Sequence, residues 1–574
     1  MSFAISRRVL VGQLIGIFLI ALGVRLWGID FGLPYGQIPD ETADITTSFQ
    51  IARGQLPTYP FHRVAWPLLQ LPLHGVHFAA LKLTNSQYSL ADFEATYYTQ
   101  RSTFIMTARI AMALLCALCI IPLYAIGYDL TERHTGGLLS ALVFAVHPAQ
   151  AYLAHTGLPD ALATVFAAIS LWAALRIART GQPRWYIIGG LATALALLLR
   201  LQLVTIGGAL LVGHLVYGLR QAPTQRSLVV TRLGWLIAGG LIGLVVFNPL
   251  FVLDPAAVLK DFQFILSERL VGTYQNDAHA QTSLANSFYN LQQNLMLPVI
   301  FMRPIVMLGA FLGIVFGVLN RNIRVLIVVV FACFALPILT TPGPRITFWL
   351  GLAIPCAALV SYAVISLAAY PRGRRPAAAM AVIVVAWCSV ETIKINTVFS
   401  QPTTQELAYE YITTQWPAET AILEGDPFVY SVPLSRTVGS MERIAAVESL
   451  PASYDFFLKN PDLIRQPAYD VYGSEYRTEI ESEDDLTQFL ADNAIEYVIE
   501  VEWCQGQITY GNLSDLTFPL ITPAVLDSLT LVQTFSPFAV DTCVQPIENR
   551  THMEYMRLWE WVRPGPIIRL YSVK

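Results

Sequence analysis

Apolar runs long enough to form membrane-spanning helices recur through the first 400 residues, separated by short polar stretches. Eleven such runs are present: Val9–Trp27, Phe104–Tyr128, Gly136–Val146, Ala161–Ala178, Tyr186–Leu199, Leu201–Leu219, Leu233–Phe251, Leu295–Leu319, Val325–Leu339, Ile346–Leu367 and Ala377–Val390. A helix needs about 20 apolar residues to cross a hydrocarbon core of about 30 Å. The pattern therefore predicts a polytopic α-helical membrane bundle of about 11 spans over residues 1–399.

The stretch Tyr186–Leu219 is too long for one crossing and is interrupted by Arg200 and Gln202. It can be read as two short helices that meet at Arg200 or as one long bent helix. In the two-helix reading, every short-loop arginine cluster falls on the face of the N-terminus, as the positive-inside rule expects. These clusters are Arg7 and Arg8; Arg133; Arg179 and Arg184; Arg220, Arg226 and Arg232; Arg321 and Arg324; and Arg372, Arg374 and Arg375. The charges favour two helices, a cytoplasmic N-terminus and an extracytoplasmic C-terminus.

The first loop on the outer face, residues 28–101, contains one further apolar stretch, Trp66–Leu83. Pro67, Pro72 and two histidines interrupt it, so we interpret it as a helix lying in the membrane interface and not as a span. Counting it as a span would invert the topology and break the arginine pattern.

Composition divides the chain into two parts. It is 55% hydrophobic and 13% charged, which is typical of a membrane protein, and residues 401–574 carry 26 acids against 10 basic residues, a net charge of −16. The remaining 400 residues are net +12. After residue 400, strand-like segments (Thr420–Leu423, Glu496–Glu502 and Ile567–Val573) are combined with helix-like segments (Gln405–Gln415 and Asp484–Asn493). This pattern predicts a C-terminal extracytoplasmic α/β domain over residues 400–574. Cys504 and Cys543 are its only cysteines and form a candidate disulfide in an oxidising compartment.

Ionisable residues on the predicted outer face are the candidates for chemistry. Asp40 and Glu41 follow the first span, Asp160 begins the fourth, Arg200 marks the break described above, and Arg345 opens the tenth. The carboxylates can act as bases, and arginines match phosphate geometry. Each also has a structural reading, because acids favour helix N-termini and arginines anchor helix ends.

The chain resembles the integral-membrane glycosyltransferases of the GT-C class, which include protein O-mannosyltransferases and lipid A aminoarabinose transferases. The resemblance covers most of the chain. Its motifs are Pro39-Asp40-Glu41, the region from Thr107-Ala-Arg109 through His147-Pro148 to Asp160, Pro342-Gly-Pro-Arg345, and the C-terminal segments Glu406–Leu423 and Tyr497–Glu500.

The resemblance implies an inverting transfer of a sugar from a polyprenyl-phosphate donor to an acceptor hydroxyl on the outer face of the plasma membrane. Asp40, with Glu41 beside it, would supply the base, and Asp160 would orient the acceptor or Asp40. Arg200 and Arg345 would neutralise the leaving phosphate, with His155, His62 and Arg63 as further candidates for substrate binding. The partners implied are this donor, the bilayer and a glycan, lipid or protein acceptor, with no nucleic acid.

Other functions stay open at this point. No cofactor is expected. His62, His74 and His77 share the first loop, and His74 and His77 are one helical turn apart. A complete set of ligands for a divalent metal is not evident around them. A transporter or flippase would line its path with Arg200 and Asp160. A membrane-anchored binding protein would use the acidic domain alone.

Overall fold

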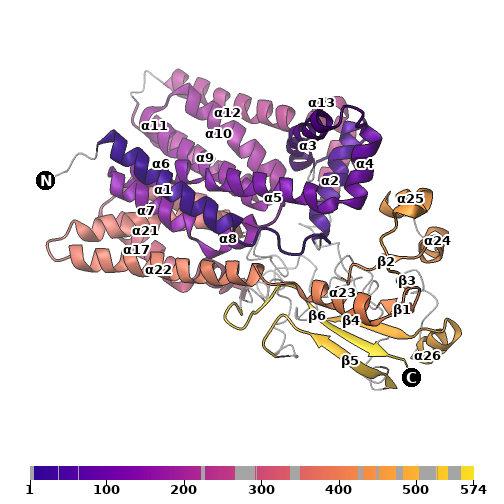
Figure 1. Cartoon of the computed structure of the whole chain (residues 1–574). Helices are drawn as coiled ribbons and strands as arrows, with labels where there is room; N and C mark the ends of the chain where they lie inside the picture. Colours follow the sequence, from indigo (N-terminus) through magenta and orange to yellow (C-terminus); the bar gives the residue numbers. More distant parts are fainter. Residues whose placement is uncertain are drawn as a thin grey trace.

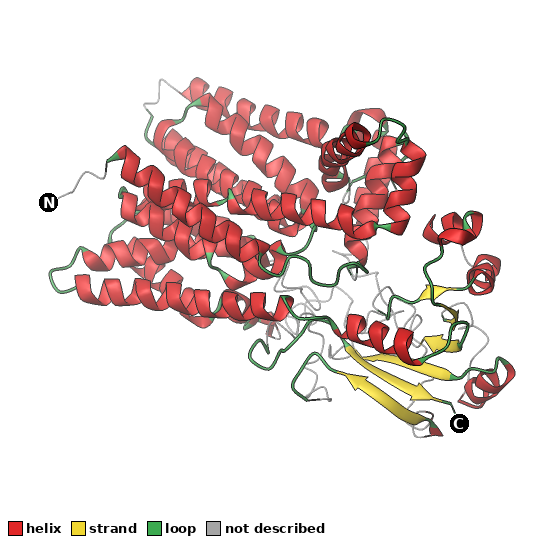
Figure 2. Ribbon diagram, viewed as in Figure 1, coloured by secondary structure: helices red, strands yellow, loops and turns green. Residues whose placement is uncertain are grey.

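The structure, a computed structural model, describes residues 6–36, 38–57, 59–61, 64–221, 226–265, 291–292, 294–336, 349–424, 431–447, 452–473, 483–502, 525, 528–540 and 557–573. A bundle of helices is formed by the first 400 residues, and a sheet with flanking helices follows it (Figure 1). Figure 2 shows this division by secondary structure, with strands confined to the C-terminal part.

Seven described helices are long and apolar enough to cross a membrane, and an eighth is obtained if the bent pair α7 (His134–Ala145) and α8 (Pro148–Ala154) is one span. The seven are α1 (Arg7–Leu26), α5–α6 (Arg101–Ala117 and Ile120–Thr131), α9 (Pro159–Thr180), η1–α11 (Leu201–Ile206 and Gly207–Leu219), α12 (Arg226–Phe247), η4–α21 (Leu350–Leu352 and Ala353–Ala368) and α22 (Arg374–Phe399) with its continuation. Three shorter apolar helices accompany them: α10 (Pro183–Leu199), α17 (Pro304–Leu319) and α18 (Ile323–Ala332). The chain is a multi-pass membrane protein, whereas a count of eleven spans requires the three shorter helices to cross as well and stays a prediction.

The break expected at Arg200 is present. Helix α10 ends at Leu199, Arg200 has an extended backbone (φ −150°, ψ 109°), and the chain resumes with η1 and α11. Both α10 and α11 pack against α9, so the two segments lie beside the same neighbour and do not form one continuous rod. The two-helix interpretation is therefore confirmed.

Glycines allow neighbouring helices of the bundle to pack closely. A Cβ added to Gly239 of α12 would lie 2.6 Å from the carbonyl oxygen of Ile187 in α10, and one added to Gly213 of α11 would lie 2.5 Å from that of Ala174 in α9. Small residues at helix contacts let backbones approach closely, which replaces the hydrophobic driving force that lipid does not provide.

The first loop forms a helical cluster at one end of the bundle (Figure 1). It consists of α2 (Pro39–Ala52), α3 (Ala65–Thr84) and α4 (Leu90–Thr99), packed on the start of α5 around Phe93, Tyr97 and Phe104. Helix α3 is the apolar stretch expected in the interface, and it is not among the described helices that qualify as spans.

The C-terminal part is built on one six-stranded sheet in the order β2-β3-β1-β4-β6-β5. Strands β1 (Ala421–Glu424), β2 (Ser435–Arg436), β3 (Ala468–Tyr472) and β4 (Tyr497–Glu502) run parallel, and β5 (Thr530–Phe535) and β6 (Ile567–Ser572) complete it antiparallel. The helices are α23 (Thr404–Gln415), α24 (Val438–Val447), α25 (Ala452–Lys459) and α26 (Glu483–Asp492). Ile422 packs toward α23 and Leu423 toward α26, so each face of the sheet has its own core. Cys504 and Cys543 lie outside the described residues, and their disulfide stays a prediction.

Aromatic contacts join the two parts. Phe399, the last residue of α22, stacks on Phe31 with ring centroids 4.5 Å apart and meets Trp561 edge-on at 5.5 Å. Tyr98 of α4 stacks on Phe456 of α25 at 4.6 Å. The C-terminal part therefore rests on the same end of the bundle as the first loop.

Candidate functional site

The acidic pair of the first loop opens helix α2. Pro39 occupies the first turn, and Asp40 and Glu41 follow it where negative charge is favoured by the helix dipole. The two neighbours then diverge, because Glu41 is 1% exposed and Asp40 is only half-buried. Asp40 is thus the more accessible carboxylate.

Glu41 is held in a closed pair with Arg109 of α5. Nε and Nη2 of Arg109 each donate to one carboxylate oxygen at 2.8 Å, and the backbone N–H of Gly157 donates to Oε1 at 2.5 Å. The remaining Nη1 of Arg109 donates to the carbonyls of Ile29 and Phe31 at 2.8 Å each, and the guanidinium lies 4.3 Å from the Phe31 ring centroid. Arg109 therefore ties the loop after α1, the start of α2 and helix α5 together.

Asp160 and Arg200 form a second pair, which is more open. Asp160 lies in the first turn of α9, is 2% exposed, and accepts a charge-assisted hydrogen bond from Nη2 of Arg200 through Oδ2. In the part of the chain that the structure describes, its Oδ1 has no hydrogen-bond partner. The Arg200 side chain is 26% exposed and projects from the break between α10 and η1. Within the described residues, this pair therefore has one carboxylate oxygen without a partner and an accessible cation.

The loop between α8 and α9 connects the two pairs. Its Gly157 donates to Glu41 as described, and its carbonyl accepts a hydrogen bond from the indole of Trp66 at 2.6 Å. Asp160 follows three residues later. The structure thereby brings the first loop, which carries Asp40, to the start of α9, which carries Asp160.

His155 occupies a different environment from the one expected for a substrate-binding residue. It is fully buried, with Nδ1 2.5 Å from the Ala151 carbonyl and Nε2 2.9 Å from the Trp27 carbonyl. Both ring nitrogens face the backbone, so in this structure the side chain joins the end of α8 to the end of α1. His62, Arg63 and Arg345 lie outside the described residues.

No group of three or more His, Cys, Asp or Glu side chains that could hold a metal is present among the described residues. His74 and His77 contact aromatic rings: His74 lies 5.2 Å from Phe49 and His77 lies 4.8 Å from Phe104, measured between ring centroids. Burial lowers the pKa of His74 to about 4.

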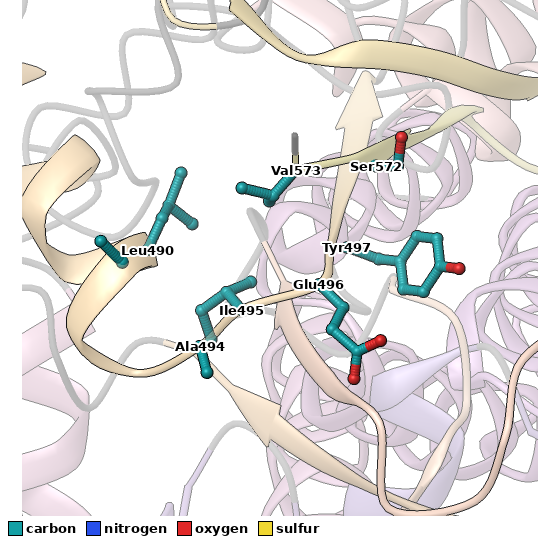
Figure 3. Close-up of a pocket in the computed structure, with 8 residues that line it drawn as sticks. Leu490, Ala494, Ile495, Glu496, Tyr497, Ser572 and Val573 are labelled. Atoms are coloured by element: carbon teal, nitrogen blue, oxygen red, sulfur yellow. The ribbon is translucent and has the colours of Figure 1, made fainter.

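A cavity of about 370 Å³ lies well away from these pairs, in the C-terminal part (Figure 3). It is bounded by the end of α26, the start of β4 and the end of β6, with Leu490, Ile495 and Val573 among its walls. Glu496 is the only charged side chain among the described residues that line it. Tyr497 and Ser572 also line it, but no second ionisable carboxylate, histidine or basic side chain accompanies Glu496 among the described lining residues, so we do not place the chemistry here.

The family model described as dolichyl-phosphate-mannose-protein mannosyltransferase matches residues 102–252. That segment is about a quarter of the chain, and it carries Arg109, Asp160 and Arg200. The match supports the GT-C class, the class of membrane glycosyltransferases that the motifs resemble. A comparison with curated proteins finds no significant match.

Solved structures similar to this chain include three membrane transferases. The oligosaccharyltransferase AglB from Archaeoglobus fulgidus, in complex with an inhibitory peptide and a dolichol-phosphate, is 12% identical, with a TM-score of 0.47 over 92% of this chain and 73% of that one. ArnT from Cupriavidus metallidurans, bound to undecaprenyl phosphate, is 12% identical, with a TM-score of 0.43 over 97% and 98%. The arabinofuranosyltransferase AftD from Mycobacteria is 14% identical, with a TM-score of 0.38 over 99% and 40%.

Proposed function

We propose that this protein is an inverting glycosyltransferase that moves a sugar from a polyprenyl-phosphate donor to an acceptor hydroxyl on the outer face of the membrane. The observation that carries the proposal is the open pair of Asp160 and Arg200, which lies beside the loop that bears Asp40. The family whose model matches residues 102–252 is named for a polyprenyl-phosphate sugar, dolichyl-phosphate-mannose, which supports the donor class.

The reaction requires charge stabilisation at the leaving group. The bond between the anomeric carbon and the phosphate oxygen breaks, and the phosphate keeps the electron pair. A guanidinium offers phosphate a planar, bidentate set of donors. Arg200 is accessible enough to turn toward such a ligand, and Arg345 would supply a second cation. Neutralising the developing charge in a site sheltered from water lowers the barrier.

The reaction also requires a base. The acceptor oxygen attacks the anomeric carbon from the face opposite the phosphate, and its proton passes to a carboxylate. Asp40 suits this role, because it is half-buried and therefore more accessible than Glu41, which is buried against Arg109. Asp160 would orient the acceptor through Oδ1, which has no hydrogen-bond partner among the described residues. One displacement gives inversion at the sugar.

The lipid carrier gives a reason for the membrane location. A donor with a polyprenyl tail stays in the bilayer, so its phosphate lies at the interface where the spans end. The arginine pattern supports an extracytoplasmic location for the first loop and the C-terminal part. The acceptor would then approach from outside the cell.

The test is donor binding to the purified protein in lipid nanodiscs. A panel of polyprenyl-phosphate sugars is added, and the shift in thermal stability is measured, because a ligand that binds only the folded state stabilises it. We expect one sugar to stabilise the protein more than the bare polyprenyl phosphate does. The same assay on Arg176→Ala, which alters a pair with Asp129 that belongs to neither site pair, should give an unchanged shift. If no member of the panel, nor the bare carrier, stabilises the protein, the proposed donor class is wrong.

A further inference from the structure

One face of α22 is apolar and exposed over several turns. Val382, Ile383, Trp387, Val390 and Ile393 are each about half exposed or more and follow the spacing of one helix face. Only 28% of the most apolar window of this candidate span is buried inside the protein. Helix α22 also lies at an edge of the bundle (Figure 1), where the face that the protein leaves exposed is available to lipid.

A residue of the C-terminal part lies against that face. A groove of about 430 Å³ is lined by Ile383, Ala386, Trp387, Val390 and Glu391 of α22 and by Trp559. Trp559 is 59% exposed although Leu558 and Trp561, on either side of it, are 2% exposed in the core. The chain is therefore fixed on both sides of an outward-pointing indole.

The groove extends from the end of the apolar run into the span. The run within α22 ends at Val390 and is followed by Glu391, Thr392 and Lys394, so Val390 lies near the membrane interface. Ile383 is 7 residues earlier, which is roughly 10 Å deeper at a rise of 1.5 Å per residue. A tryptophan that belongs to the part of the chain following the last span thus reaches alongside the span itself.

The one carboxylate in the groove does not make it polar. Glu391 is 4% exposed, and its Oε2 lies 2.8 Å from Nε of Arg303, at the junction of α16 (Leu297–Met302) and α17. Next to Trp559, Glu560 is paired with Arg557. The wall that the groove presents outward is consequently indole and aliphatic, which excludes a polar ligand.

We propose that the groove between Trp387 and Trp559 seats one acyl chain of a bilayer phospholipid, and that Trp559 thereby anchors the C-terminal part to the membrane. Tryptophan suits this position because its large ring packs on hydrocarbon while its N–H tolerates the interface. The anchor would hold the C-terminal part on the end of the bundle where Trp561 meets Phe399. This inference does not depend on the proposed function.

Photo-crosslinking in nanodiscs tests it. The full-length protein carries benzoyl-phenylalanine at position 559 and is irradiated in nanodiscs of phosphatidylcholine doped with polyprenyl phosphate, and adducts are identified by mass spectrometry. We expect phosphatidylcholine adducts at position 559 and none at position 531, which is 52% exposed on β5 of the sheet. Absence of lipid adducts at 559 overturns the anchor, and adducts of polyprenyl phosphate in preference to phosphatidylcholine overturn the choice of phospholipid.

A second experiment tests the role of the Trp559 side chain by varying it while the crosslinker stays elsewhere. Benzoyl-phenylalanine is placed at position 390 in the groove or, as the matched control, at position 246 on the exposed face of α12. The lipid adduct at 390 should exceed that at 246 several-fold, and Trp559→Ala should reduce it to the level at 246. Trp559→Phe, which keeps an aromatic wall, should retain most of it. An adduct at 390 that is unaffected by Trp559→Ala refutes a two-sided groove.

Discussion

Two buried ion pairs meet at the loop between α8 and α9, and they differ in how completely their charges are matched. In the pair of Glu41 and Arg109, both carboxylate oxygens and every guanidinium nitrogen have partners within the chain, and both side chains are at most 1% exposed. In the pair of Asp160 and Arg200, one carboxylate oxygen has no partner among the described residues and the arginine is 26% exposed.

This difference distinguishes an ion pair that stabilises the fold from one that can bind a ligand. A buried pair whose hydrogen bonds are all made fixes the positions of the segments that carry it, and removing one member leaves an uncompensated charge. A pair with an unfilled oxygen and an accessible cation can rearrange around a ligand. We infer that the first pair holds the Asp40 loop in place and that the second takes part in binding.

The largest effect should follow from removing the base. Asp40→Asn keeps the shape of the side chain but cannot accept a proton, so the rate of sugar transfer should fall by about 10² to 10⁴-fold. Donor-induced thermal stabilisation should be retained, which shows that the variant is folded. Transfer at a near-normal rate in Asp40→Asn, combined with an inactive Asp160→Asn, would place the base at the start of α9.

Glu41→Gln should act on stability. It leaves Arg109 buried and without its carboxylate, and breaking a buried pair in this way costs about 3–5 kcal/mol. The measurement is thermal or denaturant unfolding of the protein in detergent. Replacing both members with apolar residues, as in Glu41→Leu with Arg109→Met, should recover much of the loss, because the isolated charge is then removed.

If Glu41→Gln is as stable as the wild type but inactive, the contrast between the two pairs fails and Glu41 belongs with the catalytic residues. From the sequence alone, Glu41 ranks only as a milder neighbour of Asp40. The structure gives it the larger share of stability because it places Arg109 opposite.

Arg200→Ala should weaken donor binding, since a charge-assisted hydrogen bond contributes about 1.5–3 kcal/mol. The affinity for the polyprenyl-phosphate sugar should therefore fall by roughly one to two orders of magnitude. Arg200→Lys should restore only part of it, because an ammonium lacks the planar fork. Unchanged affinity in Arg200→Ala would show that the guanidinium serves Asp160 alone.

Much of this molecule could be predicted from local patterns. Apolar run lengths located the described span-length helices, the charge pattern indicated the break at Arg200, and alternation located β1, β4 and β6 close to their observed bounds. These features depend on a few consecutive residues. Strands β2, β3 and β5 and the helices α24 and α25 were missed, and each of these elements has ten residues or fewer.

Pairings between distant segments could not be predicted in the same way. Arg109 stands in a recognised motif, but nothing in its neighbourhood shows that Glu41, 68 positions earlier, is its partner. The same holds for Arg303 and Glu391, 88 positions apart, and for the backbone carbonyls around His155. Only one indication of these pairs is present in the sequence. A charged residue within an apolar segment is costly and needs a partner, but the sequence does not identify which residue that partner is.

The smallest effect concerns the pH dependence of stability. This dependence must be measured first, so that it is not mistaken for titration of the Asp160 site in a pH profile of activity. His74 lies on α3, in the same loop as Asp40, and is 4% exposed. Its folded pKa of about 4 is below its ordinary value of 6.5, because burial, and secondarily His77, disfavour the charged form. The unfolded chain therefore binds more protons between these values, so stability is lost as the pH falls from about 6.5 toward 4.

The resulting loss in the free energy of unfolding is about 2 kcal/mol near pH 5, relative to neutral pH. His74→Gln, which cannot be protonated in this range, should flatten the dependence of unfolding free energy on pH between 4 and 6.5. His77→Gln, at a less buried position whose pKa burial also lowers, should flatten it less. Should the double variant retain the full acid destabilisation, the titrating group would lie elsewhere, and the two ion pairs would be the next to examine. Measured in the His74→Gln background, the pH dependence of transfer would then report on the carboxylates of the site and not on the unfolding of the loop that carries one of them.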